Sequence, residues 1–230
     1  MDSDKLKSYI SDFVYGGTDG TVTTFAVVSG VAGAALAPSI VIILGLANLL
    51  ADGFSMGASS FLASRAEREN EQRIKQREKL LIEKEPALQK TILKQSLSDR
   101  EFPPALLNNI IDHLTKQKKT FLSAILAHKY NLHATNNKSP ASSALMTFLA
   151  FILIGSIPLL PYLISLFYPL SNLFMLSIIF TTLAFIVIGV VKGYVVEMSK
   201  TRSTLELLLV GWLAAGISYG IGFLLRGLAG

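Results

Sequence analysis

The chain has 230 residues, of which 51% are hydrophobic and only 16% are charged, and its formal net charge is +5. A typical soluble domain carries about 25% charged residues. Two segments, 20–51 and 139–191, contain no charged residue, and each exceeds the about 20 residues that one membrane crossing needs. This pattern excludes a soluble globular enzyme and a disordered chain. The absence of cysteine also excludes a disulfide scaffold and thiolate metal sites.

Five apolar stretches predict an all-α membrane protein with five transmembrane helices. A charged, cytosolic helical segment is expected between helices 2 and 3. The expected domains are 1–64 with helices 1 and 2, 65–138 as the cytosolic helical domain, and 139–230 with helices 3–5. The stretches cover about 12–35, 39–64, 142–160, 170–191 and 203–225, and the first two are joined by a tight hairpin at 34–38.

Lysine and arginine predict the orientation, because basic residues gather on the cytosolic side. They lie near the N-terminus, in 65–138 and between the fourth and fifth stretches, whereas the connections 34–38 and 158–171 carry no charge. The N-terminus is therefore expected in the cytosol and the C-terminus on the opposite side. No secretory signal is expected, because Asp2 and Asp4 lie where a signal peptide would be basic.

The charged segment 65–138 holds 15 basic and 9 acidic residues. Its apolar spacing predicts three amphipathic helices. No aromatic residues are interleaved with its basic residues, so no nucleic-acid partner is expected. The apolar positions are Leu80, Leu81, Leu88, Ile92, Leu93 and Leu97, with Pro86 as a candidate break; Leu106, Leu107, Ile110, Ile111 and Leu114; and Phe121, Leu122, Ile125 and Leu126.

Three carboxylates lie inside the apolar stretches, at Asp12, Asp19 and Asp52. An ionisable residue in a membrane span costs a few kcal/mol and is a candidate functional residue. Seven residues turn a helix by about 700°, which brings Asp12 and Asp19 onto one face about 10 Å apart along the axis. Two structural alternatives stay open: Asp12 as an interfacial residue, and Asp19 as a hydrogen-bond acceptor for a neighbouring helix.

Met56 follows Asp52 by one helical turn. A soft thioether and a hard carboxylate together suit a late first-row divalent ion better than Mg²⁺ or Ca²⁺. The alternative is simple helix packing, since small residues such as Gly53 and Gly57 surround Met56.

Three motifs resemble the vacuolar iron transporter family. They are DFVYGGTDG at 12–20, GLANLLADGFSMG at 45–57 and GWLAAGISYGIG at 211–222. The resemblance implies a homodimer of five-span subunits that exports Fe²⁺ or Mn²⁺ from the cytosol, with exchange for protons expected. It implies a path between the two first helices, with Asp12, Asp19, Asp52 and Met56 along it and Asp19 and Met56 as the metal ligands.

The chain departs from the plant-type pattern at several positions. Ser8 and Asn48 stand where plant-type members carry glutamate, and the helix around 121–129 lacks the Glu and Met of their cytosolic metal cluster. A stripe of glutamates remains, and we expect it to be a solvated face paired with Arg and Lys rather than a metal site. The stripe comprises Glu67, Glu71, Glu78 and Glu85, and His113, His128 and His133 are expected at the surface.

The sequence thus predicts a metal transporter and not an enzyme, with the ion as cargo and no resident cofactor. The expected partners are the divalent ion, protons, the bilayer and a second copy of the chain. The alternative is a non-transporting membrane scaffold whose cytosolic helices bind a partner. The bacterial inner membrane is expected rather than a vacuolar membrane, since no targeting segment is evident.

Overall fold

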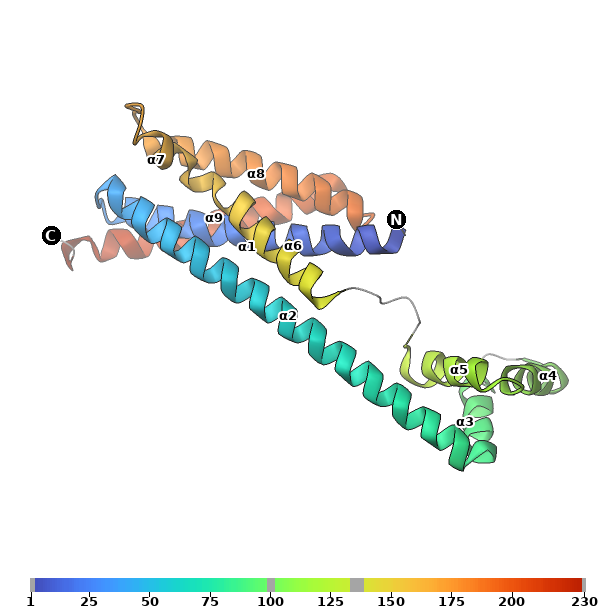
Figure 1. The fold of residues 1–230 in the computed structure, drawn as a ribbon. Coiled ribbons are helices and arrows are strands. Elements are labelled where there is room, and N and C mark those ends of the chain that lie inside the picture. The colour runs from blue at the N-terminus through green and yellow to red at the C-terminus, as the bar shows by residue number, and fades with distance from the viewer. Residues whose placement is uncertain (1–2, 99–101, 133–138, 229–230) are drawn as a thin grey trace. The chain divides into compact units, whose positions relative to one another are not determined.

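The computed structural model describes residues 3–98, 102–132 and 139–228, and the regular elements in these ranges are all helices. They divide into two compact units, here called unit 1 and unit 2 (Figure 1). Unit 1 comprises Met1–Leu62 and Ser139–Gly230, and unit 2 comprises Ala63–Lys138. The all-α class expected from the sequence is confirmed for the described residues.

Proline marks the start of several helices, because its fixed φ suits the first turn and its missing N–H is not needed there. The break at Pro86 is confirmed. The helices that begin with proline are α2 (Pro38–Lys84), α3 (Pro86–Ser98), α4 (Pro104–Thr115) and α6 (Pro140–Gly155). The others are α1 (Ser3–Gly33), α5 (Lys118–Tyr130), α7 (Leu160–Ile164), α8 (Leu173–Val195) and α9 (Lys200–Leu224), with short 3₁₀ turns η1 (Ile157–Leu159) and η2 (Arg226–Leu228).

Four helical segments of the described chain are long and apolar enough to cross a membrane. They are α2, the bent segment Pro140–Ile164 that contains α6 and α7, α8 and α9. Four of the five expected spans are thus found, and α1 is not among them. Its composition explains this, because Asp12, Asp19 and several Gly and Thr residues lower its hydropathy. The crossing of α1 stays a prediction.

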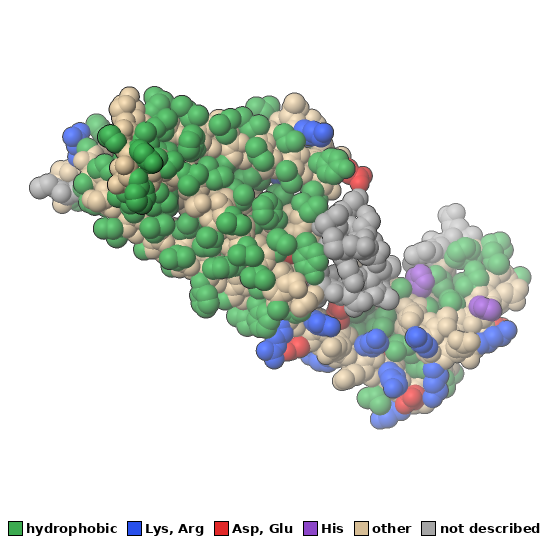
Figure 2. Space-filling view, turned by 45° about the horizontal axis from the view of Figure 1, so that its top comes forward, with side chains coloured by type: hydrophobic (Ala, Val, Ile, Leu, Met, Phe, Trp, Pro, Cys, Tyr) green, Lys and Arg blue, Asp and Glu red, His purple; other side chains and the backbone are tan. Residues whose placement is uncertain are grey.

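Unit 1 is built around α1, which packs against α6, α8 and α9. Its neighbours bury polar side chains of α1 such as Thr21 and Thr24, both at 0% exposure. Apolar side chains instead cover the face of unit 1 that Figure 2 shows. Phe54, Leu153 and Leu209 are among the large apolar side chains of unit 1 that are exposed. A soluble protein does not expose so continuous an apolar surface, so unit 1 is the membrane part of an integral membrane protein.

Contacts between consecutive turns give the direction of each helix in unit 1. Along α1 and α6, Gly16 lies on Thr147 and Gly20 lies on Phe151, so these two helices run the same way. Phe25 with Trp212 and Gly30 with Ser218 show that α9 runs in the same direction as α1. Gly45 with Leu159 and Gly57 with Phe148 show that α2 runs opposite to α6. Gly189 with Thr204 and Gly193 with Lys200 show that α8 runs opposite to α9.

The end of α2 and helices α3–α5 enclose the apolar core of unit 2. Most of the apolar positions expected to face inward do so, among them Leu93, Leu107 and Ile125. Leu80, Leu88 and Leu106 were expected on the buried face but are 56%, 51% and 47% exposed, and Ile82 is buried instead. For Leu80 and Leu88 the reason is the break at Pro86, which gives the two sides of the expected single helix different faces.

Candidate functional site

Asp12 and Asp19 both lie on α1, and both side chains are half-buried. The Oγ atom of Ser143, at the start of α6, donates a hydrogen bond of 2.7 Å to Oδ2 of Asp12. Ser143 is itself only 2% exposed. Asp12 is therefore not simply an interfacial residue open to solvent, since a buried hydroxyl of another helix holds it.

Asp52 lies on α2, and its side chain is half-buried. Its carboxylate lies close enough to that of Asp19 for the two charges to interact. Two like charges in an apolar unit repel each other unless a cation or a proton lies between them. The structure thus places Asp52 within electrostatic range of Asp19, although the two are 33 positions apart in the sequence.

Met56 is half-buried and packs against an apolar cluster of unit 1 that contains Leu49 and Phe151. Within the described residues, no three His, Cys, Asp or Glu side chains gather into a group that could hold a metal ion. The described part of one chain therefore offers carboxylates and a thioether near one another along α1 and α2, but not a closed ligand shell of the usual acidic or imidazole type.

Two glycines fix the distance between α1 and α6. A Cβ atom at Gly20 would lie 2.5 Å from the carbonyl oxygen of Phe151, and one at Gly16 would collide with the carbonyl oxygen of Thr147. Any side chain at these positions would push the helices apart. The glycines that neighbour Asp12 and Asp19 in the sequence thus serve close backbone packing.

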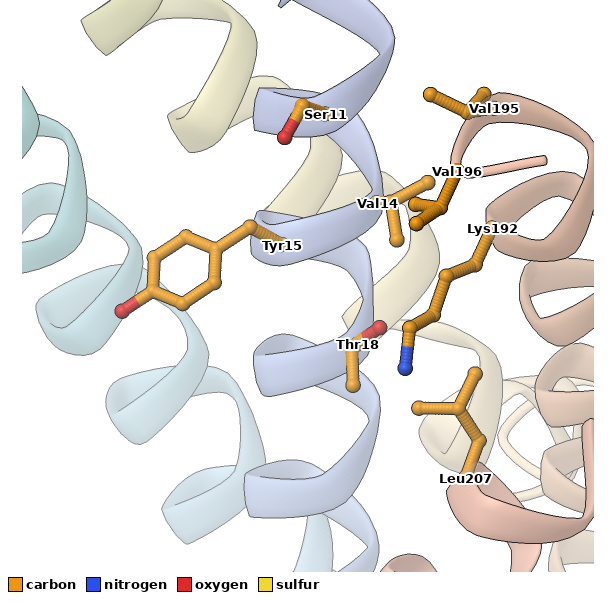
Figure 3. A pocket seen from close by; sticks show the side chains of 8 residues that line it. All are labelled: Ser11, Val14, Tyr15, Thr18, Lys192, Val195, Val196 and Leu207. Carbon is orange, nitrogen blue, oxygen red and sulfur yellow. The ribbon is translucent and has the colours of Figure 1, made fainter. Parts of the chain in front are cut away.

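A cavity of about 260 Å³ lies on another side of α1, between α1, α8 and α9 (Figure 3). Lys192 of α8 extends into it toward Thr18, and its Nζ atom lies 3.6 Å from Oε2 of Glu206. The remaining lining is mostly apolar. A lysine in this position disfavours a metal cation in the cavity, because the two positive charges repel.

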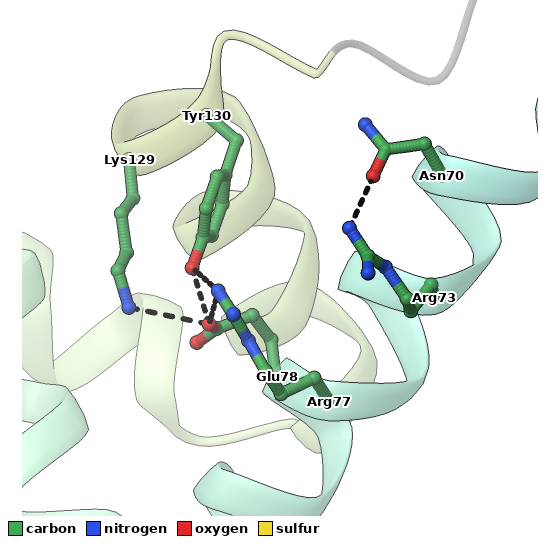
Figure 4. Close-up of polar contacts among 6 residues, drawn as sticks. All are labelled: Asn70, Arg73, Arg77, Glu78, Lys129 and Tyr130. Atoms are coloured by element: carbon green, nitrogen blue, oxygen red, sulfur yellow. Dashed lines mark hydrogen bonds and ion pairs between the residues drawn. The ribbon is translucent and has the colours of Figure 1, made fainter. Parts of the chain in front are cut away.

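Unit 2 contains a buried carboxylate that the sequence did not lead us to expect (Figure 4). Glu78 is 0% exposed, so the prediction of a solvated glutamate stripe is wrong at this position. Its Oε1 atom accepts hydrogen bonds from the Tyr130 hydroxyl at 2.5 Å and from Lys129 Nζ at 3.2 Å. Arg77 Nη2 lies 3.5 Å from the same oxygen and donates to the Tyr130 hydroxyl at 2.5 Å.

These contacts change the acidity of the cations around Glu78. Burial by itself lowers the pKa of Lys129, but its interactions with Tyr130 and Glu78 outweigh this, so the pKa of Lys129 is raised above its usual value. Arg77 is likewise raised in pKa, first by its hydrogen bond with Tyr130. The Lys129 and Arg77 side chains therefore keep their positive charges at neutral pH. Together with the Tyr130 hydroxyl, both lie against the Oε1 atom of Glu78.

Exposed side chains beside the stripe form contacts within one helical turn. Glu69 accepts a hydrogen bond from Arg65 at 2.7 Å, and Arg73 donates to Asn70 at 2.9 Å. Arg73 stands four residues after Glu69, a spacing that suits a helix salt bridge, but its partner is Asn70. Both arrangements use neighbours one turn apart, and their exposure limits each to a fraction of a kcal/mol, about 0.3–0.5.

Sequence reasoning missed Ser143, Tyr130 and Lys129 as partners of carboxylates. Ser143 gave a weak signal, as a polar residue in an apolar stretch. Tyr130 gave none, because it lies 52 positions from Glu78 and no local spacing connects the two. His133, one of the three histidines expected at the surface, lies outside the described residues. His113 is exposed and His128 is half-buried.

Comparison with known proteins adds a family to this geometry. A family profile described as the VIT family matches residues 10–223. A vacuolar iron transporter of Plasmodium berghei is 30% identical over 233 residues, covering 98% of this chain and 84% of the relative. One of Toxoplasma gondii is 30% identical over 225 residues, covering 95% and 74%. Vacuolar iron transporter 1 of Eucalyptus grandis is 28% identical over 213 residues, covering 92% and 84%.

Proposed function

The chain belongs to the VIT family, and from this premise we propose that it exports Fe²⁺ or Mn²⁺ from the cytosol across a membrane in exchange for protons. The observation that carries the proposal is the placement of Asp12, Asp19 and Asp52 within the membrane unit. Carboxylates are costly there, and such residues mark ion and proton pathways. The names of the relatives support iron as a cargo.

All five long helices of unit 1 cross the membrane in this proposal, α1 included. The helix directions support it, since α1, α6 and α9 run one way and α2 and α8 run the other, as five successive crossings require. With the basic residues of 65–138 in the cytosol, the N-terminus is cytosolic and the C-terminus lies on the other side.

The ion path runs between the α1 helices of two subunits. One chain supplies too few ligands, because no group of three acidic, His or Cys side chains forms among its described residues. A two-fold axis beside α1 would bring two copies of Asp19 and of Met56 to one ion. Carboxylate oxygens together with thioether sulfurs can bind Fe²⁺ and Mn²⁺.

Proton exchange follows from the same carboxylates. A carboxylate binds a metal ion only after it loses its proton, so each ion that enters displaces protons. The proximity of Asp19 and Asp52 strengthens this coupling, because a cation or a proton relieves their mutual repulsion.

Flux in liposomes tests the proposal. Purified protein is reconstituted with a metal-sensitive dye inside, and Fe²⁺ and Mn²⁺ are added in parallel under an imposed pH gradient. We expect wild-type flux that is lost in Asp19→Asn and kept in Asp112→Asn, a matched change at an exposed residue of unit 2. Absence of flux with both ions from folded wild-type protein would refute transport and favour a membrane scaffold.

A further inference from the structure

Ser143 has no role in the proposed path, yet it contacts one of the path's carboxylates. It lies in the first turn of α6, is 2% exposed, and donates a 2.7 Å hydrogen bond to Oδ2 of Asp12. Its neighbour Ser142 is exposed. The buried serine is thus the one that meets the carboxylate.

Close packing of α1 on α6 keeps this bond in register. The pairs Asp12 with Ser143, Gly16 with Thr147 and Gly20 with Phe151 follow one another at intervals of four residues on both helices. Residues four apart share one face of a helix. Because Gly16 and Gly20 bring the two backbones into contact, the helices cannot slide past each other without separating, and the Ser143 hydroxyl stays opposite Asp12.

We propose that Ser143 is a positioning residue for metal binding, which orients the Asp12 carboxylate toward the ion path by holding its Oδ2 atom. This inference rests on the proposed function. Hydrogen bonds to ligating carboxylates orient them and raise metal affinity, and removal of such a partner costs about 10-fold or more in affinity. A hydroxyl donor leaves the carboxylate its negative charge, which a lysine or arginine in the same place would cancel.

The test compares Ser143→Ala with Ser142→Ala in the full-length protein. We measure the KM and maximal rate of Mn²⁺ flux in liposomes and the affinity for Mn²⁺ by calorimetry in detergent. Ser143→Ala should raise KM and weaken affinity by about 10-fold while the maximal rate changes little. Ser142→Ala should match wild type.

A double-mutant cycle separates positioning from packing. On an Asp12→Asn background, Ser143→Ala should leave Mn²⁺ affinity unchanged, since the carboxylate that it positions is gone. An equal loss on both backgrounds, or wild-type KM and affinity for Ser143→Ala, would overturn the inference. Either of these two results would overturn the role of Ser143 while the wild-type protein still transports Mn²⁺. If the proposed function itself is wrong, the wild-type protein shows no flux.

Discussion

Glu78 allows a sharp test of how unit 2 is held together. We predict that Glu78→Ala destabilises unit 2, because the change removes the only carboxylate shared by Tyr130, Lys129 and Arg77 among the described residues. Breaking a fully buried ion pair costs about 3–5 kcal/mol. Here Lys129 and Arg77 are 31% and 60% exposed, so both regain water and the penalty is smaller.

The remaining cost comes from two sources. The hydrogen bond from Tyr130 to a charged acceptor contributes about 1.5–3 kcal/mol, and the space left by the buried side chain adds a cavity cost of about 1 kcal/mol. We therefore expect Glu78→Ala to destabilise unit 2 by about 2–4 kcal/mol, which corresponds to about 30- to 900-fold faster amide exchange through cooperative opening.

Hydrogen–deuterium exchange of the full-length protein in detergent measures this effect. Peptides from α3 and α5 should exchange faster in Glu78→Ala, while peptides from α8 and α9 should not change. The matched control is Glu83→Ala on the same helix, whose exposed pair with Lys118 at 3.4 Å is worth less than about 1 kcal/mol. Equal exchange in Glu78→Ala, Glu83→Ala and wild type would refute the reasoning.

Three further predictions concern single positions. Ala35, in the turn after α1, has a φ of 55°, where a residue with a Cβ atom is destabilised by about 1–2 kcal/mol. Ala35→Gly should therefore stabilise the protein by about 0.5–1 kcal/mol, once the greater freedom of glycine in the unfolded chain is counted, and raise the melting temperature in detergent. Gly20→Ala should lower the free energy of unfolding by about 1–3 kcal/mol, and with it the melting temperature, because the new methyl group would meet the Phe151 backbone. Gly216→Ala has open space and should be neutral or stabilising. The raised pKa of Lys129 contributes stability that is fully present below its unfolded pKa of about 10.4 and is lost as the pH rises through the folded value. Circular-dichroism melts should thus show unit 2 weakening above about pH 10, and Lys129→Met should flatten that alkaline limb.

Local signals predicted the helices well. Proline at the first helical position set the starts of α3 and α4, and the short uncharged link at 34–38 became the turn between α1 and α2. These features depend on residues within one or two turns of each other. The face of α2 after residue 78 was harder to predict, because burial there depends on which helix of unit 2 packs against it, and apolar periodicity gave Leu80 rather than Ile82.

The candidate site shows the same difference between features of a single helix, which the sequence predicts, and contacts between helices, which it does not. The shared face of Asp12 and Asp19 is a property of one helix, so their spacing was sufficient. The electrostatic interaction of Asp19 with Asp52 and the hydrogen bond of Asp12 with Ser143 each join separate helices. Only the packing of unit 1 decides such pairs, and a single sequence carries no spacing rule for them.

Asp19, inside the membrane unit, differs from the paired carboxylates of unit 2 in the charges around it. In unit 2, Glu69, Glu78 and Asp112 each have a lysine or arginine of the same unit within 3.5 Å, so their charges are balanced by the chain itself. In unit 1, Glu206 is likewise paired, with Lys192 and Arg202. Asp19 has no such pair among the described residues, and the charge that acts on it is the negative charge of Asp52. Two such negative charges are balanced only by a cation that comes from outside the chain, either a proton or a metal ion. Because such cations can leave again, unpaired carboxylates such as Asp19 suit the proposed transport, whereas the fixed pairs of unit 2 suit a structural role.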